Sequence, residues 1–387
     1  MAGADASARI LENDRSRWSD PPDPDVLRPI ELHRTLPEYE VTPLVRLDAV
    51  ASRLGLAGVW LKDESWRLGL PSFKILGGAW AVHRLLLSRA GRPVDGARFR
   101  DLRAAAAEAG PVTLATATDG NHGRGVARMA RLLGFDAVVY VPEGTAPARI
   151  DGIAEEGARV VVHDGNYDEA VARAASDAAE HGWEVVADVA YDGYVDVPTW
   201  VMDGYDTIFE EADGQLPDTP TAVVLQAGVG AFTGAALRHY LKKGGPRPRF
   251  ATIEPLTAAC LLASAEAGEA VTIDAGHESI MAGLNCGSVS TVAWPYIRAE
   301  ISVFAAIHDD RAREAMRLLA DAGVVAGESG AAALGGLLEL ATHDGARAAL
   351  ALDADAHVLL VNTEGATDPV GYKATVGRSP EDVRAGS

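Results

Sequence analysis

Short apolar runs alternate with longer amphipathic stretches along most of the chain. The short runs, which predict buried strands, are 59–61, 112–115, 137–141, 160–163, 184–187, 221–226, 251–254 and 357–361. The longer stretches, which carry apolar residues at helical spacing, are 73–88, 123–133, 148–156 and 170–178. Strands that alternate with helices predict an α/β fold with mostly parallel sheets covered by helices.

The length of 387 residues indicates more than one domain. We expect a large discontinuous domain made of 1–72 and 198–387, and a small domain made of 73–197. Within the large domain, residues 1–40 have the composition of an irregular, proline-rich lead-in. The polar tail after Pro369 is expected to fray.

The excess of acidic residues argues against binding to nucleic acids or to anionic membranes. The chain carries 35 basic and 55 acidic residues, a net charge of −20. Nucleic acids and anionic membranes need a basic face, so neither is an expected partner. The charge-free stretch 219–237 is interrupted by glycines and predicts strand, loop and helix rather than a membrane span. The charged N-terminus does not have the pattern of a secretory signal, which favours a cytoplasmic location.

Two cysteines, Cys260 and Cys286, are too few for a disulfide framework. Two thiols in a reducing compartment are expected, and a single bridge between them is the alternative. The spacing of cysteine and histidine residues does not match a zinc site, so no metal is predicted.

Lysine is rare, with five among the 35 basic residues. Lys74 lies in PSFKILGG (71–78), where Ser72 is the expected N-cap of a helix. The positive end of the helix dipole disfavours an ammonium group there and favours the neutral amine that Schiff-base chemistry uses. A surface lysine is the alternative. Lys62 stands beside two acidic residues and is expected in a surface ion pair.

Three loops after predicted strands carry further chemistry. Residues 116–123 combine small residues with an amide and a carboxylate, although a capped turn would explain them equally, and His122 by itself favours a structural role. The glycines of 228–234 precede a helix, where backbone N–H groups can hold a phosphate, although they also suit a tight turn. Thr363 follows the last predicted strand, where its hydroxyl would lie at the ligand-binding edge of the sheet, although a turn that ends the strand explains it equally. A lysine nucleophile, an amide, a phosphate cradle and a hydroxyl are together what a pyridoxal phosphate site requires.

These segments resemble the fold-type II (tryptophan synthase β-like) pyridoxal phosphate enzymes and, more closely, the diaminopropionate ammonia-lyases. The segments that carry the resemblance are TPLVRL (42–47), PSFKILGGAWA (71–81), ATATDGNHGRGVA (115–127), PTWVMDGYDT (198–207), QAGVGAFTGA (226–235), MAGLNCGSVS (281–290), GESGAAALG (327–335) and NTEGATDP (362–369). The resemblance implies two domains, each with a mostly parallel sheet flanked by helices, and pyridoxal 5'-phosphate in the cleft between them.

The resemblance also implies roles for individual residues. Lys74 would form the Schiff base, Phe73 would pack beside the cofactor ring and Asn121 would bind the ring hydroxyl. Thr363 would face the pyridine nitrogen, where a neutral hydroxyl favours β-elimination over transamination. The residues whose backbone amides would hold the phosphate are Gly228, Val229, Gly230, Ala231 and Phe232.

The implied reaction releases pyruvate and two molecules of ammonia from 2,3-diaminopropionate, as a step of amino-acid catabolism. Asp119 would be the base for the D-isomer and Lys74 the base for the L-isomer. Asp188 would be a second acidic residue near the substrate, although a solvated turn carboxylate is the alternative. Thr118 and Tyr167 are weaker candidates for substrate contact, and core packing explains Tyr167 equally.

Two other functions remain open. A dehydratase or β-replacement enzyme would act on serine, threonine or another β-substituted amino acid, and Asp119 argues against the first two substrates. A sensor of amino acids without catalysis would have no need of the Schiff base, so Lys74 argues against it. The expected partners are a small amino-acid substrate and a second copy of the chain in a homodimer.

Overall fold

The computed structural model describes residues 7–13, 28–92, 98–118, 120–165, 167–191, 193–274 and 278–386. The chain divides into two compact units. The first, here the seven-stranded unit, consists of the described parts of Met1–Pro24, Thr42–Ser65 and Glu211–Ser387. The second, here the four-stranded unit, consists of the described parts of Asp25–Val41 and Trp66–Glu210.

The seven-stranded unit is built on one sheet, whose strand order over the described residues is β1-β10-β9-β8-β11-β3-β2. The strands are β1 (Arg9–Glu12), β2 (Leu44–Arg46), β3 (Gly58–Asp63), β8 (Ala222–Gln226), β9 (Arg249–Pro255), β10 (Ile301–Ile307) and β11 (His357–Asn362). The edge strands β1 and β2 are antiparallel to their neighbours, and the inner strands pair in parallel. This arrangement confirms the predicted mostly parallel sheet.

The helices of this unit are α2 (Asp48–Leu54), α10 (Ala231–Lys243), α11 (Cys260–Ala267), the 3-10 helix η2 (Ala282–Leu284), α12 (Trp294–Glu300), α13 (Asp309–Asp321), α14 (Glu328–Leu340), α15 (Asp344–Leu350), α16 (Pro369–Val376) and α17 (Pro380–Ala385). Helix α14 packs on β8, β9, β10 and β11 and is buried almost throughout. A Cβ atom on Gly336 would lie 2.2 Å from Ile253 Cδ1, so glycine permits this close packing.

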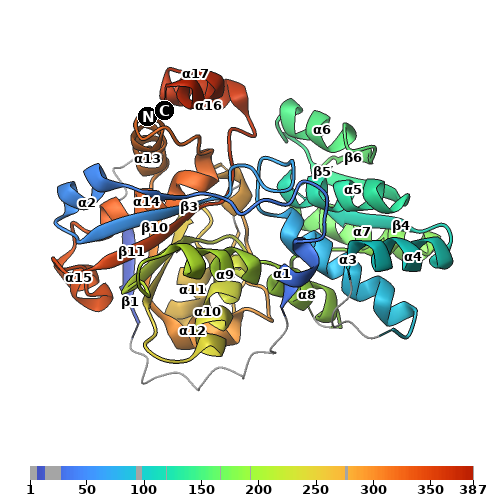
Figure 1. Cartoon of the computed structure of the whole chain (residues 1–387), viewed down its shortest axis with the longest axis horizontal. Coiled ribbons are helices and arrows are strands. Elements are labelled where there is room, and N and C mark those ends of the chain that lie inside the picture. The colour runs from blue at the N-terminus through green and yellow to red at the C-terminus, as the bar shows by residue number, and fades with distance from the viewer. Residues whose placement is uncertain are drawn as a thin grey trace. The chain divides into compact units, whose positions relative to one another are not determined.

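The four-stranded unit has a fully parallel sheet of order β6-β5-β4-β7 within its described residues. Its strands are β4 (Thr113–Ala117), β5 (Asp136–Pro142), β6 (Arg159–His163) and β7 (Glu184–Val185). Its helices are α1 (Pro29–His33), α3 (Ile75–Arg89), α4 (Phe99–Ala109), α5 (Asn121–Leu133), α6 (Pro147–Ala154), α7 (Tyr167–His181) and α8 (Asp196–Gly204). Helices α5 and α7 both pack on β4 and β5 (Figure 1). The boundary between the units falls within α9 (Asp206–Gln215).

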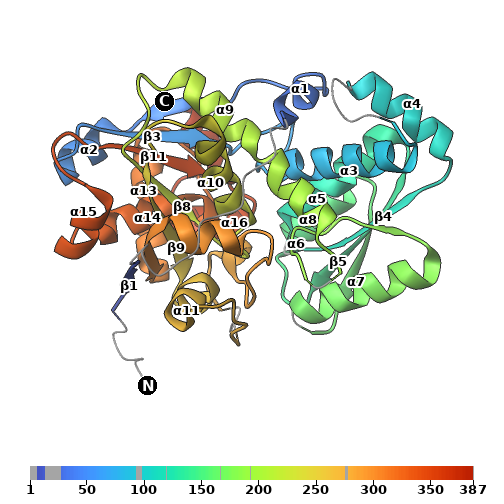
Figure 2. The same ribbon diagram turned by 90° about the horizontal axis from the view of Figure 1, so that it is seen from below.

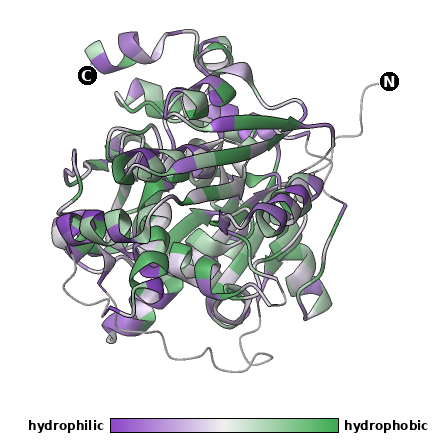
Figure 3. Ribbon diagram, turned by 90° about the vertical axis from the view of Figure 1, so that its right-hand side faces the viewer, coloured by the Kyte–Doolittle hydropathy of each residue, from purple (hydrophilic) through white to green (hydrophobic). Residues whose placement is uncertain are grey.

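Hydropathy explains these layers. Several strands are drawn in the hydrophobic colour in Figure 3, whereas many helices show both colours. Residues of β8 and β10 are buried along their whole length, as expected for parallel strands covered on both faces. In the described part of the chain, no helix combines the length and apolar character that a membrane crossing needs.

The structure differs from the expectations in its strands, of which β2 and β10 were not predicted, and at both ends of the chain. Strand β10 is missing from the predicted strands because α12 ends at Glu300 and β10 follows without a turn residue between them. The lead-in contains β1, which pairs with β10, and helix α1 (Figure 2). The tail does not fray, because it forms α16 and α17, with Tyr372 and Val383 buried and Ser379 capping α17.

Candidate active site

Lys74 lies where the main chain enters α3. The helix begins at Ile75 and Lys74 is its N-cap, so the prediction that Ser72 caps the helix is wrong. Two glycines bring neighbouring helices close to this point. A Cβ on Gly125 of α5 would lie 2.9 Å from Ile75 Cα, and one on Gly77 would lie 2.7 Å from the carbonyl oxygen of Val201 in α8. Close helix packing therefore holds the backbone that carries Lys74.

The amine of Lys74 is paired with a carboxylate. Its Nζ lies 2.6 Å from Oδ2 of Asp188, and the side chains are 21% and 8% exposed. Burial raises the pKa of Asp188, but the charges of Lys74 and His122 outweigh it, so the pKa lies below its ordinary value. Asp188 is thus an ionised, buried partner of the lysine, and the solvated turn carboxylate is excluded.

Two aromatic rings flank this pair. The Lys74 amine lies 5.7 Å from the ring centroid of Phe73 and 5.9 Å from that of Tyr205, and the two rings are 4.6 Å apart. Burial raises the pKa of Tyr205 above its ordinary value, although Lys74 opposes this shift. The phenol therefore stays protonated. Sequence reasoning missed Tyr205 as an individual residue, although its segment PTWVMDGYDT carries part of the family resemblance.

The loop between β4 and α5 has the tight geometry that its composition suggests. Gly120 has φ +148°, a value that favours glycine, and its N–H donates to Thr118 Oγ1 at 3.0 Å. Asn121 begins α5 and is half-buried. His122 Nε2 lies 2.8 Å from the Val186 carbonyl oxygen, a contact of the kind that a structural histidine makes. Asp119 lies outside the described residues, so its role stays a prediction.

Tyr167 is the first residue of α7 and is half-buried. Its role in substrate contact stays a prediction.

The glycine-rich loop joins β8 to α10. Gly230 has φ +92° and is the N-cap of α10, without a side-chain hydrogen bond to the first turn. A Cβ on Gly228 would lie 3.0 Å from Cys286 Sγ and 3.2 Å from the Gly283 carbonyl oxygen. Both positions therefore need glycine, one for its backbone conformation and one for space. The first N–H groups of a helix have no partner within the helix, which suits an anion.

Thr363 follows β11, and Gln226 ends the neighbouring strand β8. Gln226 Nε2 lies 2.7 Å from Thr363 Oγ1, and both side chains are buried. Thr233, in the first turn of α10, has a buried hydroxyl that makes no hydrogen bond within the described structure. Sequence reasoning missed Gln226 and Thr233, because neither pattern nor composition shows which polar side chains a fold buries together.

Lys62 is not in a surface ion pair. Its side chain is 0% exposed, and its Nζ donates to Glu211 Oε2 at 2.7 Å, the Thr42 carbonyl oxygen at 2.7 Å and Gln215 Oε1 at 2.8 Å. The expectation was wrong because β3 lies inside the sheet, so a side chain between two acidic neighbours in sequence is covered by distant segments.

The fold therefore gathers the predicted residues in two groups. Phe73, Lys74 and Asp188 lie together in the four-stranded unit, and the glycine-rich loop and Thr363 belong to the seven-stranded unit.

Cys260 and Cys286 are both thiols, in agreement with the expectation. Among the described residues, no cluster of His, Cys, Asp or Glu could hold a metal ion.

Each group, taken by itself, has chemistry that pyridoxal phosphate requires. A lysine at a helix N-terminus offers the amine for a Schiff base. The first turn of α10, with the buried Thr233 hydroxyl, provides donors for a phosphate. Thr363 has a hydroxyl that already accepts a hydrogen bond from Gln226 and can donate its own hydrogen. These features define the class of protein as a pyridoxal phosphate enzyme.

Comparison with known proteins agrees with this class. The family model of pyridoxal-phosphate dependent enzymes matches residues 35–364. Diaminopropionate ammonia-lyase of Escherichia coli strain K12 is 40% identical over 358 residues, 89% of each chain. The crystal structure of holo diaminopropionate ammonia lyase from Escherichia coli with selenomethionine has a TM-score of 0.88 at 37% identity and covers 96% of this chain and 97% of that chain.

A second structure of the Escherichia coli enzyme, in complex with an aminoacrylate–pyridoxal phosphate azomethine reaction intermediate, has a TM-score of 0.85 at 36% identity, with the same coverage of the two chains. The chain therefore belongs to the pyridoxal-phosphate dependent enzymes of fold type II and, within them, to the diaminopropionate ammonia-lyases.

Proposed function

We propose that this protein eliminates ammonia from 2,3-diaminopropionate and forms pyruvate and a second ammonia. The observation that carries the proposal is the Lys74–Asp188 pair, 2.6 Å apart at the start of a helix, in a member of this family. When bound, pyridoxal phosphate supplies the electron sink that makes the substrate Cα proton acidic.

Three residues of the chain are proposed to hold the cofactor, position the groups and transfer protons. The Lys74 amine holds the cofactor as a Schiff base and afterwards moves the Cα proton of the L-isomer. The Asp188 carboxylate keeps the lysine in position and can accept a hydrogen bond from the β-amino group of the substrate. Asp119, outside the described residues, is proposed as the base for the D-isomer.

The other predicted residues bind and orient. The backbone amides from Gly228 to Phe232 hold the phosphate, supported by the first turn of α10. Asn121 binds the ring hydroxyl, Phe73 packs beside the ring and Thr363 donates to the pyridine nitrogen.

The first experiment measures pyruvate from D- and L-2,3-diaminopropionate with the protein loaded with pyridoxal phosphate, and L-serine and L-threonine serve as controls. We expect rapid pyruvate from diaminopropionate and little from either hydroxy amino acid. Pyruvate from serine or threonine instead would make the protein a dehydratase. Bound cofactor without pyruvate from any of these substrates would refute the proposed elimination.

Lys74→Arg tests the role of the lysine. Arginine keeps the positive charge beside Asp188 but cannot form the Schiff base, so pyruvate formation should fall by about a thousandfold or more. Borohydride reduction of the wild-type holoenzyme should place the cofactor on the peptide that contains Lys74. Lys373→Arg, on the exposed face of α16, is the matched control and should keep full activity. Activity that persists in Lys74→Arg would overturn the assignment.

Oligomeric state and location are part of the proposal. We infer a homodimer, a cytoplasmic location and no nucleic-acid partner, on the grounds of family resemblance and the net charge of −20. Light scattering coupled to size-exclusion chromatography tests the dimer, and a monomer at micromolar concentration would contradict it.

A further inference from the structure

The amide of Gln226 makes several contacts at the ends of β8 and β11. Its Nε2 lies 2.7 Å from Thr363 Oγ1, 3.0 Å from the Val361 carbonyl oxygen and 3.3 Å from the Gly330 carbonyl oxygen. Gln226 is 2% exposed and Thr363 is 5% exposed. The contacts therefore form away from water, where the direction of each hydrogen bond matters most.

The backbone decides which way this amide is turned. Val361 and Gly330 present carbonyl oxygens, which only accept hydrogen bonds. The NH2 group of Gln226 must face them, because the opposite orientation would place Oε1 against two other acceptors. Within the described structure, Oε1 makes no hydrogen bond of its own, so the contacts of Nε2 alone hold the amide.

The direction of the Gln226–Thr363 hydrogen bond follows. An amide nitrogen does not accept hydrogen bonds, so at 2.7 Å the Thr363 oxygen is the acceptor. The hydroxyl hydrogen of Thr363 must then point to another group. Within the described residues this buried hydroxyl donates no hydrogen bond, so it is able to donate to an atom of a ligand.

We propose that Gln226 is a positioning residue that fixes the Thr363 hydroxyl as a hydrogen-bond donor towards the ring nitrogen of pyridoxal phosphate. This inference rests on the proposed function, which places the pyridine nitrogen opposite Thr363. A pyridine nitrogen accepts a hydrogen bond only when it carries no proton. Through Thr363, Gln226 would influence whether the ring nitrogen is protonated and therefore how strongly the ring withdraws electrons.

A purely structural role would have different consequences. Gln226 also joins β8 to β11 and to α14, which contains Gly330. If that were its only task, its loss would lower stability and leave the ring nitrogen unchanged. The state of the nitrogen therefore separates the two roles, and activity alone does not.

The test uses holoenzyme reconstituted with pyridoxal phosphate labelled with 15N in the ring. The 15N chemical shift distinguishes a neutral pyridine from a pyridinium. In the wild type we expect the neutral value across the pH range in which the protein is folded. A pyridinium shift in the wild type would overturn the proposal, and this measurement does not depend on whether any variant folds.

Gln226→Met keeps the length of the side chain and removes the donor. The Thr363 hydroxyl is then free to turn, so we expect a changed 15N shift and a fall in kcat of about tenfold with KM little changed. The same substitution in a Thr363→Val background should add nothing, because the hydroxyl it orients is gone. Unchanged 15N shift and kcat in a folded Gln226→Met holoenzyme would overturn the proposal, as would independent effects of the two substitutions.

Gln215→Met is the matched control. Gln215 is a glutamine of the same unit whose amide donates to the Thr42 carbonyl oxygen at 3.0 Å and accepts from Lys62. It should leave the 15N shift unchanged, and a shift equal to that of Gln226→Met would overturn the proposal. Failure of the wild type to act on diaminopropionate would refute the proposed substrate and leave the 15N result standing by itself.

Discussion

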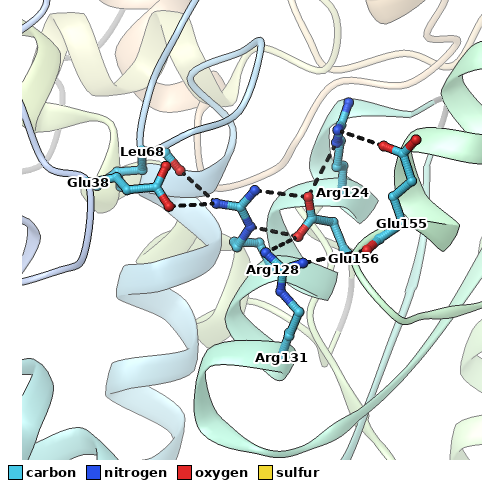
Figure 4. Close-up of polar contacts among 7 residues, drawn as sticks. All are labelled: Glu38, Leu68, Arg124, Arg128, Arg131, Glu155 and Glu156. Carbon is cyan, nitrogen blue, oxygen red and sulfur yellow. Dashed lines mark hydrogen bonds and ion pairs between the residues drawn. The ribbon is translucent and has the colours of Figure 1, made fainter.

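Each unit buries a glutamate, and the two units balance its charge differently. In the seven-stranded unit, Glu211 is 1% exposed and Lys62, itself fully buried, is the cation beside it. In the four-stranded unit, Glu156 lies 2.6 Å from Arg128, 3.0 Å from Arg131 and 3.7 Å from Arg124 (Figure 4).

The comparison shows that the loss of one cation matters more where the ion pair is fully buried than where other cations lie nearby. The ammonium of Lys62 donates to three acceptors inside the protein, so its removal takes away the charge that compensates Glu211. Around Glu156, Arg131 is half exposed and can compensate in part for a lost neighbour. Removal of the cation from a fully buried ion pair is costly, whereas removal of one of several cations from a cluster that reaches water costs less.

The largest expected effect is that of Lys62→Met. It should lower the free energy of unfolding of the seven-stranded unit by about 3–5 kcal/mol, because Glu211 stays buried beside an apolar side chain. Hydrogen exchange, read separately for peptides of each unit, measures the loss. The double variant Lys62→Met, Glu211→Leu is the control and should recover most of the stability. Equal loss in both variants would show that packing rather than charge is responsible.

The second largest expected effect is a loss of stability of the four-stranded unit at low pH, caused by His83. Burial, followed by the charge of Arg84, lowers the pKa of His83 in α3 to about 4, and neither ring nitrogen makes a hydrogen bond in the described structure. The folded state binds the proton less well than the unfolded chain. Stability is therefore fully present above about pH 6.5 and is lost as the pH falls towards 4, by up to about 3 kcal/mol.

His83→Phe removes the titrating group and keeps a ring beside Trp80, which lies 4.9 Å from the histidine ring. Exchange rates of the four-stranded unit should rise between pH 6.5 and 4 in the wild type and rise less in the variant. Identical pH profiles would mean that other groups cause the acid sensitivity. Peptides of the seven-stranded unit provide the internal comparison.

The smallest expected effect is that of Arg128→Met. Arg128 also donates to the Leu68 carbonyl oxygen at 3.1 Å, so some cost is certain, but two arginines remain beside Glu156. We expect a loss of about 1–2 kcal/mol, less than that of Lys62→Met. Urea unfolding monitored by exchange in the four-stranded unit measures it. A loss equal to that of Lys62→Met would contradict the expectation that the three arginines around Glu156 make each of them less important than Lys62 is beside Glu211.

The predicted strands show which elements the local apolar pattern can identify and which it cannot. Buried parallel strands such as β8 and β11 are uniformly apolar and end at glycine or polar residues, so the apolar run marks them well. Strand β10 is equally apolar, but it follows α12 directly. Helix and strand cannot be separated by pattern where no turn residue divides them. The tail was mistaken for a frayed end because its few buried side chains lie among polar neighbours.

The sequence by itself determined the alternation of strands and helices, the lysine at the start of α3 and the glycine-rich turn before α10. Each of these depends on neighbours a few residues apart, where spacing and backbone preference act directly. Only the tertiary structure decided that Asp188 meets Lys74 across 114 positions, that Gln226 orients Thr363 across 137 and that Lys62 is buried against Glu211 across 149. Burial and the direction of hydrogen bonds arise when distant segments exclude water together, and no local pattern encodes that.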